Sequence, residues 1–264
     1  ILDLSPEGHQ PMASADGRWV VAFNGEIYNH GALREELRAL GHAFRGHSDT
    51  EVLLAALAQW GVEAALERSN GMLALAAWDR RERVLWLARD RVGKKPLYYG
   101  RASDGSLVFG SELAALRAHP ALKAEVDPDA LALLLRLDYI PAPHCILRGV
   151  RKLEAGHLLR VDAAALASGQ LPPARAWWDA GNSQRAAIAE GFEGSDAQAM
   201  DALDALLRDA TALRMEADVP LGAFLSGGTD SSLVMALMQA QSARPVRSYS
   251  IGFDHDGHDE SAHA

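Results

Sequence analysis

Short apolar runs alternate with turn residues through the first two thirds of the chain, a pattern typical of strands that follow one another closely. The runs that predict strands are residues 19–23, 72–78, 84–88 and 107–109. Between them, apolar side chains recur at helical spacing in two stretches, one with Leu33, Leu37 and Leu40 and one with Leu53, Leu54, Leu57 and Trp60. Ser48 followed by Glu51 predicts a capping box at the start of the second helix. We therefore expect a layered α+β domain over residues 1–180, with helices outside antiparallel sheets.

The pattern changes after residue 180. Residues 181–195 are small and polar without a sustained period, which predicts a linker between domains. Beyond this linker, a helical stripe is formed by Leu203, Leu206, Leu207, Ala210 and Leu213. A buried apolar strand over 219–225 then ends at a glycine pair, and a helix over 231–241 and a strand over 246–253 follow. This order is typical of the opening of a doubly wound α/β domain, which we expect over residues 196–264.

Composition narrows the class of function. The chain has 264 residues, 48% of them hydrophobic, and a formal net charge of −9 without a dense run of Lys or Arg. We therefore expect no nucleic-acid partner and no anionic membrane surface, and small-molecule chemistry becomes the default. Because no apolar run reaches the roughly 18 residues of a membrane span, we also expect a cytoplasmic protein. The single cysteine, Cys145, excludes an internal disulfide framework and a Cys-rich zinc site.

A glycine-rich loop at the predicted strand–helix junction is the sharpest local signal. Two glycines allow backbone N–H groups to turn around an anion, serine hydroxyls add donors, and the helix N-terminus adds partial positive charge. We expect ATP-binding residues at Leu225, Ser226, Gly227, Gly228, Asp230 and Ser231. No Lys follows the glycines, so this is not a Walker loop. The alternative interpretation is a capped βα turn without a nucleotide.

The loop resembles the pyrophosphatase loop of enzymes that cleave ATP between its α- and β-phosphates, which implies adenylylation. A carboxylate at Asp230 would repel phosphate unless a cation lay between them, so Asp230 is the candidate ligand for Mg²⁺. On the next strand, Ile251 and Gly252 are candidates for contact with adenine, and a plain core strand explains them equally well. Thr229 departs from the aliphatic residue usual at its position in this loop.

A second signal is Asn24-Gly25, which follows an apolar run directly. Taken alone, Asn-Gly after a strand predicts a hairpin turn. Read with the rest of the chain, it is one of several blocks that occur in the order found in glutamine-hydrolysing asparagine synthetases, which the chain resembles from end to end. The blocks lie at residues 24–29, 46–51, 88–99, 110–112, 139–143, 151–157 and 225–232.

This resemblance implies a glutaminase domain of the N-terminal-nucleophile type, joined to an ATP-pyrophosphatase synthetase domain. Asn24 and Gly25 would form the oxyanion hole for the tetrahedral intermediate from glutamine. Glutamine would also be recognised by Glu26 and by Asp49, whose carboxylate can pair with the substrate's α-ammonium. Ile1 and Leu2 align with the end of the segment whose preceding arginine binds the glutamine carboxylate in the family.

The family's nucleophile, a cysteine at the mature N-terminus, and that arginine are not among these residues. The chain starts without Met and stops in a polar run, so we expect an internal fragment of a longer protein. Cys145 lies in a proline-rich turn far along the chain from Asn24, which favours a packing role. A dyad with His144 is disfavoured because adjacent side chains on an extended segment point to opposite faces. The remaining histidines form no zinc motif.

The activity implied by the resemblance is a carbon–nitrogen ligase that makes asparagine from aspartate, ATP and glutamine. The substrates would be small molecules, and a homodimer is one of the assemblies that the resemblance allows. Two alternatives stay open. One is a related amidotransferase that adenylylates another carboxylate, as in β-lactam synthetase relatives or polysaccharide-cluster enzymes. The other is an inactive, truncated binding protein.

Overall fold

A computed structural model of the chain describes residues 2–252. The chain divides into two compact units. One is Ser5–Ala189, and the other combines Ile1–Leu4 with Glu190–Ala264. None of the helices in the described range has the length and hydropathy that a bilayer crossing requires.

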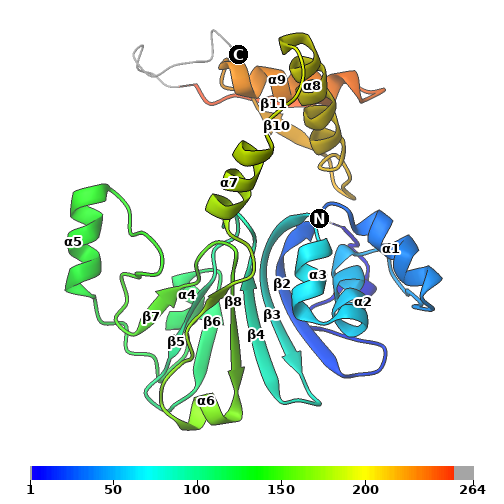
Figure 1. The fold of residues 1–264 in the computed structure, drawn as a ribbon. Coiled ribbons are helices and arrows are strands. Elements are labelled where there is room, and N and C mark those ends of the chain that lie inside the picture. The colour runs from blue at the N-terminus through cyan, green and yellow to red at the C-terminus, as the bar shows by residue number, and fades with distance from the viewer. Residues whose placement is uncertain (1, 253–264) are drawn as a thin grey trace. The chain divides into compact units, whose positions relative to one another are not determined.

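Two antiparallel sheets form the larger unit (Figure 1). The six-stranded sheet has the order β1 (Met12–Ala13), β2 (Trp19–Ile27), β3 (Gly71–Asp79), β4 (Val84–Arg89), β8 (His157–Asp162) and β9 (Arg175–Ala176). The three-stranded sheet has the order β6 (Leu107–Gly110), β5 (Tyr98–Arg101) and β7 (Val150–Lys152). The helices of this unit are η1 (Pro6–Gly8), α1 (His30–Ala39), α2 (Asp49–Trp60), α3 (Val62–Arg68), α4 (Leu113–Arg117), α5 (Pro128–Leu137) and α6 (Ala163–Ala167).

The large sheet is buried on both faces. Helices α1 to α3 cover one face, and the three-stranded sheet lies on the other (Figure 1). Side chains along β3 point alternately to the two cores. Leu75 packs with the helices, whereas Ala74 and Ala76 pack with Tyr99 of β5 and with Leu97, which precedes it. The expected layered α+β architecture with antiparallel sheets is therefore confirmed. Small alanines on the inner face leave room between the sheets, where the pocket described below lies.

Asn24 and Gly25 lie inside a strand, not in a hairpin turn. The apolar run predicted over 19–23 continues to Ile27, and β2 pairs with β3 along its whole length, with Asn24 opposite Ala74 and Gly25 opposite Leu73. The ladder to β3 overrides the local turn preference of Asn-Gly. This extension carries both predicted oxyanion residues onto the sheet itself.

The start of α2 follows the sequence prediction in part. Ser48 Oγ accepts a hydrogen bond from the N–H of Glu51 at 3.2 Å, as an N-cap should. The Glu51 carboxylate accepts from the N–H groups of Arg45 and Gly46 at 2.8 and 3.0 Å. Glu51 therefore holds the loop before α2 through two backbone hydrogen bonds.

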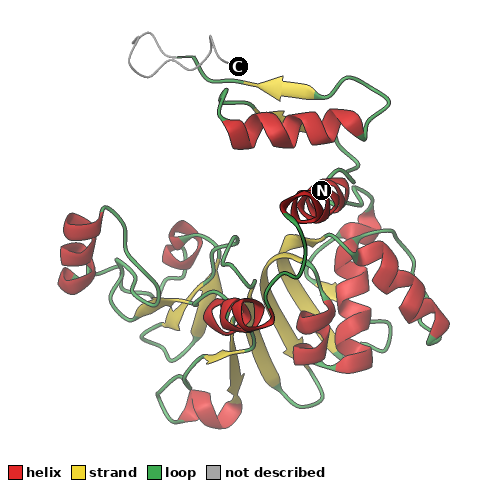
Figure 2. Ribbon diagram, turned by 45° about the horizontal axis from the view of Figure 1, so that its top comes forward, coloured by secondary structure: helices red, strands yellow, loops and turns green. Residues whose placement is uncertain are grey.

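The smaller unit contains α8 (Asp196–Ala212), β10 (Gly222–Phe224), α9 (Thr229–Ala240) and β11 (Arg247–Tyr249). Strands β10 and β11 are parallel, with Ala223 opposite Ser248, and α9 connects them. Figure 2 shows the two strands in yellow with α9 in red beside them. The predicted order of strand, glycine turn, helix and strand is confirmed. Both strands are shorter than predicted, and the end of the second prediction, Phe253, lies outside the described residues.

The segment predicted as a linker, residues 181–195, contains most of helix α7 (Ala180–Glu190) and the boundary between the two compact units. Alanines favour helix, and Asp179 Oδ1 accepts from the N–H of Asn182 at 2.6 Å at the start of α7. One expectation about this region was wrong. The strand before the glycine loop was expected to be buried, but Gly222 and Phe224 are exposed in β10. Only β11 pairs with it among the described strands.

Candidate active site

A pocket opens between the two sheets at Asn24. Its volume is about 240 Å³. The residues that line it come from β2, β3, β6 and their neighbouring loops, namely Gln10, Ala22, Phe23, Asn24, Ala74, Ala76, Leu97, Phe109, Gly110 and Ser111. Asn24 Nδ2 donates a hydrogen bond to Ser111 Oγ at 2.8 Å, which links β2 to the residue that follows β6. Asn24 is thus the polar group that the large sheet presents to this pocket.

The backbone N–H of Gly25 points away from β3. Leu73, the residue opposite Gly25, uses both of its backbone groups toward Asp90: its N–H donates to Asp90 Oδ2 at 3.2 Å, and its carbonyl accepts from the N–H of Asp90 at 2.9 Å. In an antiparallel ladder a residue directs its N–H and C=O to the same side, so the pair Gly25–Leu73 is a non-hydrogen-bonded pair. The N–H of Gly25 therefore faces the outer edge of β2.

Side chains occupy this outer edge on both sides of Gly25. The N–H of Phe23 donates to Gln10 Oε1 at 2.6 Å, and the N–H of Ile27 donates to Asp49 Oδ2 at 2.8 Å. Strand β1 pairs only with the beginning of β2 and does not reach Gly25. Within the described residues, the N–H of Gly25 between these two capped groups has no hydrogen-bond partner. A free backbone donor beside an amide side chain is the arrangement that stabilises an oxyanion.

Gly25 also has no room for a side chain. A Cβ built on Gly25 would lie 2.1 Å from the carbonyl oxygen of Met72. A Cβ on Gly71, at the other side of the same ladder, would lie 2.2 Å from the carbonyl oxygen of Glu26. The two strands therefore approach each other at a distance that only glycine permits.

Asp49 is placed at the end of β2 by its bond to Ile27. It is the first residue of α2 and only 6% exposed. Burial raises the pKa of its carboxyl group above 3.8, while the hydrogen bond from Ile27 and the charge of His30 act in the opposite direction. Asp49 is thus a buried carboxyl group fixed at the edge of β2, two residues beyond Gly25.

The structure gives fewer contacts for the other residues that are predicted to bind glutamine. Glu26 is half-buried in β2, next to Gly25. Leu2 belongs to the smaller compact unit and is not grouped with Asn24. Ile1 lies outside the described residues. The site residues that sequence reasoning missed are Gln10, which had no motif around it, and Ser111, which stood in a recognised block without a role.

The glycine-rich loop of the smaller unit closes on itself through its serines. Ser226 Oγ and Ser231 Oγ are 3.0 Å apart, and Ser231 Oγ donates to the carbonyl of Gly228 at 3.1 Å. Gly227 has a φ of +75°, which favours glycine, and α9 begins directly after Gly228. The loop thus leads into a helix N-terminus, where unpaired backbone N–H groups attract anions.

The remaining predicted ATP-binding residues flank this loop. The N–H of Leu225 donates to the carbonyl of Tyr249 at 2.9 Å, which ties the loop to β11. Asp230 is exposed in the first turn of α9, and Ile251 and Gly252 are exposed after β11. No group of three or more His, Cys, Asp or Glu residues that could hold a metal ion occurs in the described part of the chain.

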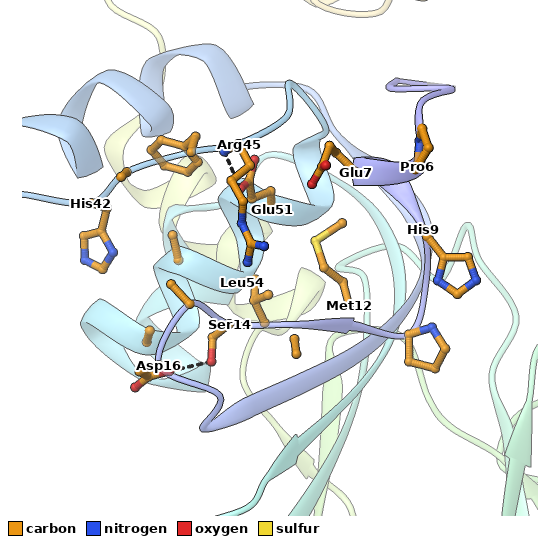
Figure 3. A pocket seen from close by; sticks show the side chains of 17 residues that line it. Pro6, Glu7, His9, Met12, Ser14, Asp16, His42, Arg45, Glu51 and Leu54 are labelled. Carbon is orange, nitrogen blue, oxygen red and sulfur yellow. Dashed lines mark hydrogen bonds between the residues drawn. The ribbon is translucent and has the colours of Figure 1, made fainter.

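A larger cavity of about 520 Å³ lies between the segment before β1 and helix α2 (Figure 3). It shares no lining residue with the pocket at Asn24. Two of its carboxylates already have partners. Asp16 Oδ1 accepts from Ser14 Oγ at 2.6 Å, and Glu51 binds the loop N–H groups of Arg45 and Gly46. These hydrogen bonds stabilise the loops around the cavity. Neither Asn24 nor Gly25 lines it.

Cys145 has the packing role predicted for it. It is 4% exposed, belongs to the core beneath the three-stranded sheet, and its Sγ accepts from the N–H of Leu147 at 3.4 Å. Burial raises the pKa of the Cys145 thiol, which keeps it in the unreactive protonated form.

Comparison with known proteins adds to this geometry. Residues 1–178 match the family model described as glutamine amidotransferase domain, and residues 202–264 match asparagine synthase. A putative glutamine-hydrolysing asparagine synthetase of Mycobacterium tuberculosis (strain H37Rv) is 37% identical in a gapped alignment of 267 positions, which covers 98% of this chain and 39% of that protein. The glutamine-hydrolysing asparagine synthetase 3 of Bacillus subtilis is 34% identical over 254 residues, 94% of this chain and 39% of that protein.

Among solved structures, the glutamine phosphoribosylpyrophosphate amidotransferase of B. subtilis, complexed with ADP and GMP, aligns with a TM-score of 0.47 at 20% identity. That alignment covers 66% of this chain and 33% of that chain. The chain spans 39% of the length of the two curated relatives described above. It belongs to the glutamine amidotransferase domain family, and to the branch in which this domain is followed by an asparagine synthase domain.

Proposed function

We propose that the larger unit hydrolyses the side-chain amide of glutamine. The observation that carries this proposal is the free N–H of Gly25, which lies between two capped N–H groups and beside the Asn24 carboxamide. In the tetrahedral intermediate the amide oxygen of glutamine becomes an oxyanion, and these two donors would bind it. The attacking thiolate is not supplied by Cys145, since that thiol is buried in the core.

Glutamine would be oriented by its α-amino group. Asp49 offers a buried carboxylate at the end of the same strand, and an ammonium group would pair with it by a charge-assisted hydrogen bond. Such a bond contributes about 1.5–3 kcal/mol. Glu26, next to Gly25, is the second carboxylate proposed for substrate recognition.

The smaller unit is proposed to bind ATP at the glycine-rich loop. The N–H groups at the start of α9 and the hydroxyl groups of Ser226 and Ser231 supply donors for the pyrophosphate part of the nucleotide. Asp230 stands in the first turn of α9, and its carboxylate would be a ligand for Mg²⁺. Mg²⁺ commonly binds through one or two carboxylates together with substrate phosphates, and it would neutralise the charge of the leaving pyrophosphate.

Together these activities would make asparagine. The β-carboxylate of aspartate attacks the α-phosphate of ATP and releases pyrophosphate, and ammonia from glutamine then displaces AMP from the acyl-adenylate. Glutamate is the second product of glutamine hydrolysis. The names of the relatives support aspartate as the acceptor. A cytoplasmic location, where ATP and glutamine are supplied, belongs to the same proposal.

The test uses the natural protein that contains this chain. It is incubated with aspartate, ATP, Mg²⁺ and amide-¹⁵N glutamine, and the products are identified by mass spectrometry. The proposal predicts ¹⁵N-asparagine, AMP and pyrophosphate in equal amounts. Release of AMP only when another carboxylic acid replaces aspartate would assign a different acceptor, and no turnover of ATP or glutamine would identify a binding protein.

A further inference from the structure

Ser111 lies between the end of β6 and the start of α4. It directly follows Gly110, the last residue of β6. A Cβ on Gly110 would lie 2.9 Å from Leu116 Cδ1, and Leu116 is buried in the core of this sheet. The absence of a side chain at Gly110 leaves room for Leu116 of α4 against the end of β6, next to Ser111.

The contact between Ser111 and Asn24 crosses from one sheet to the other. The two residues are 87 positions apart in the sequence, both line the pocket, and Asn24 Nδ2 lies 2.8 Å from Ser111 Oγ. The Asn24 carboxamide has no other hydrogen-bond partner among the residues that the structure describes. An amide nitrogen carries two hydrogens, so one bond to Ser111 leaves the second hydrogen free for a ligand in the pocket.

An unanchored carboxamide would not present this hydrogen reliably. The last torsion of asparagine is broad and roughly two-fold, so rotation exchanges Nδ2 for Oδ1. An oxygen turned toward a developing oxyanion repels it, whereas the nitrogen stabilises it. The bond to Ser111 Oγ restricts this rotation, and the charge of the oxyanion favours the orientation with the nitrogen toward it. Ser111 therefore contributes to catalysis without touching the substrate.

We propose that Ser111 is a positioning residue for glutamine hydrolysis, because its hydroxyl oxygen holds the Asn24 carboxamide with a hydrogen of Nδ2 directed at the oxyanion. This inference rests on the proposed glutaminase function. It assigns a role to Ser111 of the sequence block at residues 110–112.

The test is a double-mutant cycle in the natural protein that contains this chain. We expect Ser111→Ala to lower the kcat for glutamine hydrolysis about tenfold while KM changes less than about twofold, since only the oxyanion interaction is weakened. Asn24→Ala should lower kcat by about 10²–10³-fold, the usual effect of losing one oxyanion donor. Because Ser111 acts through Asn24, adding Ser111→Ala to Asn24→Ala should change kcat less than about twofold.

Two further variants separate positioning from a general structural effect. Ser111→Thr retains the hydroxyl and should restore kcat to within about threefold of the wild type. Ser103→Ala, the matched control, removes a hydroxyl that donates to the carbonyl of Ala121 at 2.9 Å in the β5–β6 connection, and it should leave glutamine hydrolysis unchanged. Synthesis from free ammonia should be retained in every variant, which shows that the protein is folded.

The proposal is overturned if Ser111→Ala hydrolyses glutamine at the wild-type rate, or if its effect multiplies with that of Asn24→Ala. In either case glutamine hydrolysis by the wild type would still support the proposed function. If the wild type does not hydrolyse glutamine, the proposed function fails, and the role of Ser111 fails with it.

Discussion

The structure gives the size of the steric clash that Gly25→Ala would introduce, and hence its expected effect on glutamine hydrolysis. The new Cβ would lie 2.1 Å from the carbonyl oxygen of Met72, which is 1.3 Å short of the 3.4 Å where ordinary van der Waals contact begins. Both groups belong to the backbone, so no side-chain rotation relieves the clash. Strands β2 and β3 must therefore separate by about 1 Å at Gly25, and a displacement of that size at a reacting centre costs about 10²-fold in rate.

We expect Gly25→Ala to lower kcat/KM for glutamine hydrolysis by about 10²-fold or more, and to lower the free energy of unfolding by about 1–3 kcal/mol, as overpacking does. Glutamine hydrolysis, ammonia-dependent synthesis and urea unfolding of the natural protein are measured side by side. Gly31→Ala in α1 is the matched control: a Cβ there meets nothing within 4 Å, and alanine stabilises a helix by up to about 1 kcal/mol over glycine. Wild-type glutamine hydrolysis by Gly25→Ala would refute the geometry of the oxyanion site.

Three further predictions follow from the carboxylates. Because burial raises the pKa of Asp49 above 3.8, its ionised form is lost as the pH falls through that raised value, so KM for glutamine should rise with acidification. Asp49→Asn should raise KM about 10- to 100-fold and flatten this pH profile; an unchanged profile would exclude Asp49 as the ammonium partner. Asp230→Asn should abolish ATP-dependent synthesis and spare glutamine hydrolysis, and equal loss of both would contradict the assigned role. Burial raises the pKa of Asp79, but the hydrogen bonds from Arg18 and from the N–H groups of Arg81 and Glu82 together outweigh burial and leave the pKa below 3.8. The stability from these bonds is therefore present above pH 3.8 and is lost as the pH falls through the lowered value. In urea unfolding, Asp79→Asn should cost about 1–3 kcal/mol at pH 7, a difference that shrinks below pH 3.8; a pH-independent cost would contradict the pairing.

Periodicity in the sequence was enough to predict the sheets, the main helices and the order of elements around the glycine loop. It failed in two places, one where a partner distant in sequence decides the local structure and one where local helix propensity does. Asn24-Gly25 has the composition of a turn, yet it continues β2 because β3 pairs with it. The segment 181–195 has the composition of a linker, yet alanines and the cap at Asp179 make most of it helical.

The candidate site was predictable only where its residues stand in motifs. Asn24, Gly25 and Asp49 were found through blocks of sequence, and the structure joins Asp49 to the same strand edge through Ile27. The free N–H of Gly25 could not be found in this way, because it depends on the register of β2 against β3. Gln10 accepts a hydrogen bond from the N–H of Phe23 at the outer edge of β2, although the two residues are 13 positions apart in the sequence. No local sequence pattern predicts such a contact.

The central claim is tested most directly by asparagine formation in the Asn24→Ala variant of the natural protein, with glutamine and with ammonium chloride as alternative nitrogen donors. The account predicts that the glutamine-dependent rate falls by about 10²–10³-fold while the ammonia-dependent rate stays within about twofold of the wild type. A wild-type rate with glutamine would contradict the account, as would an equal loss with both donors.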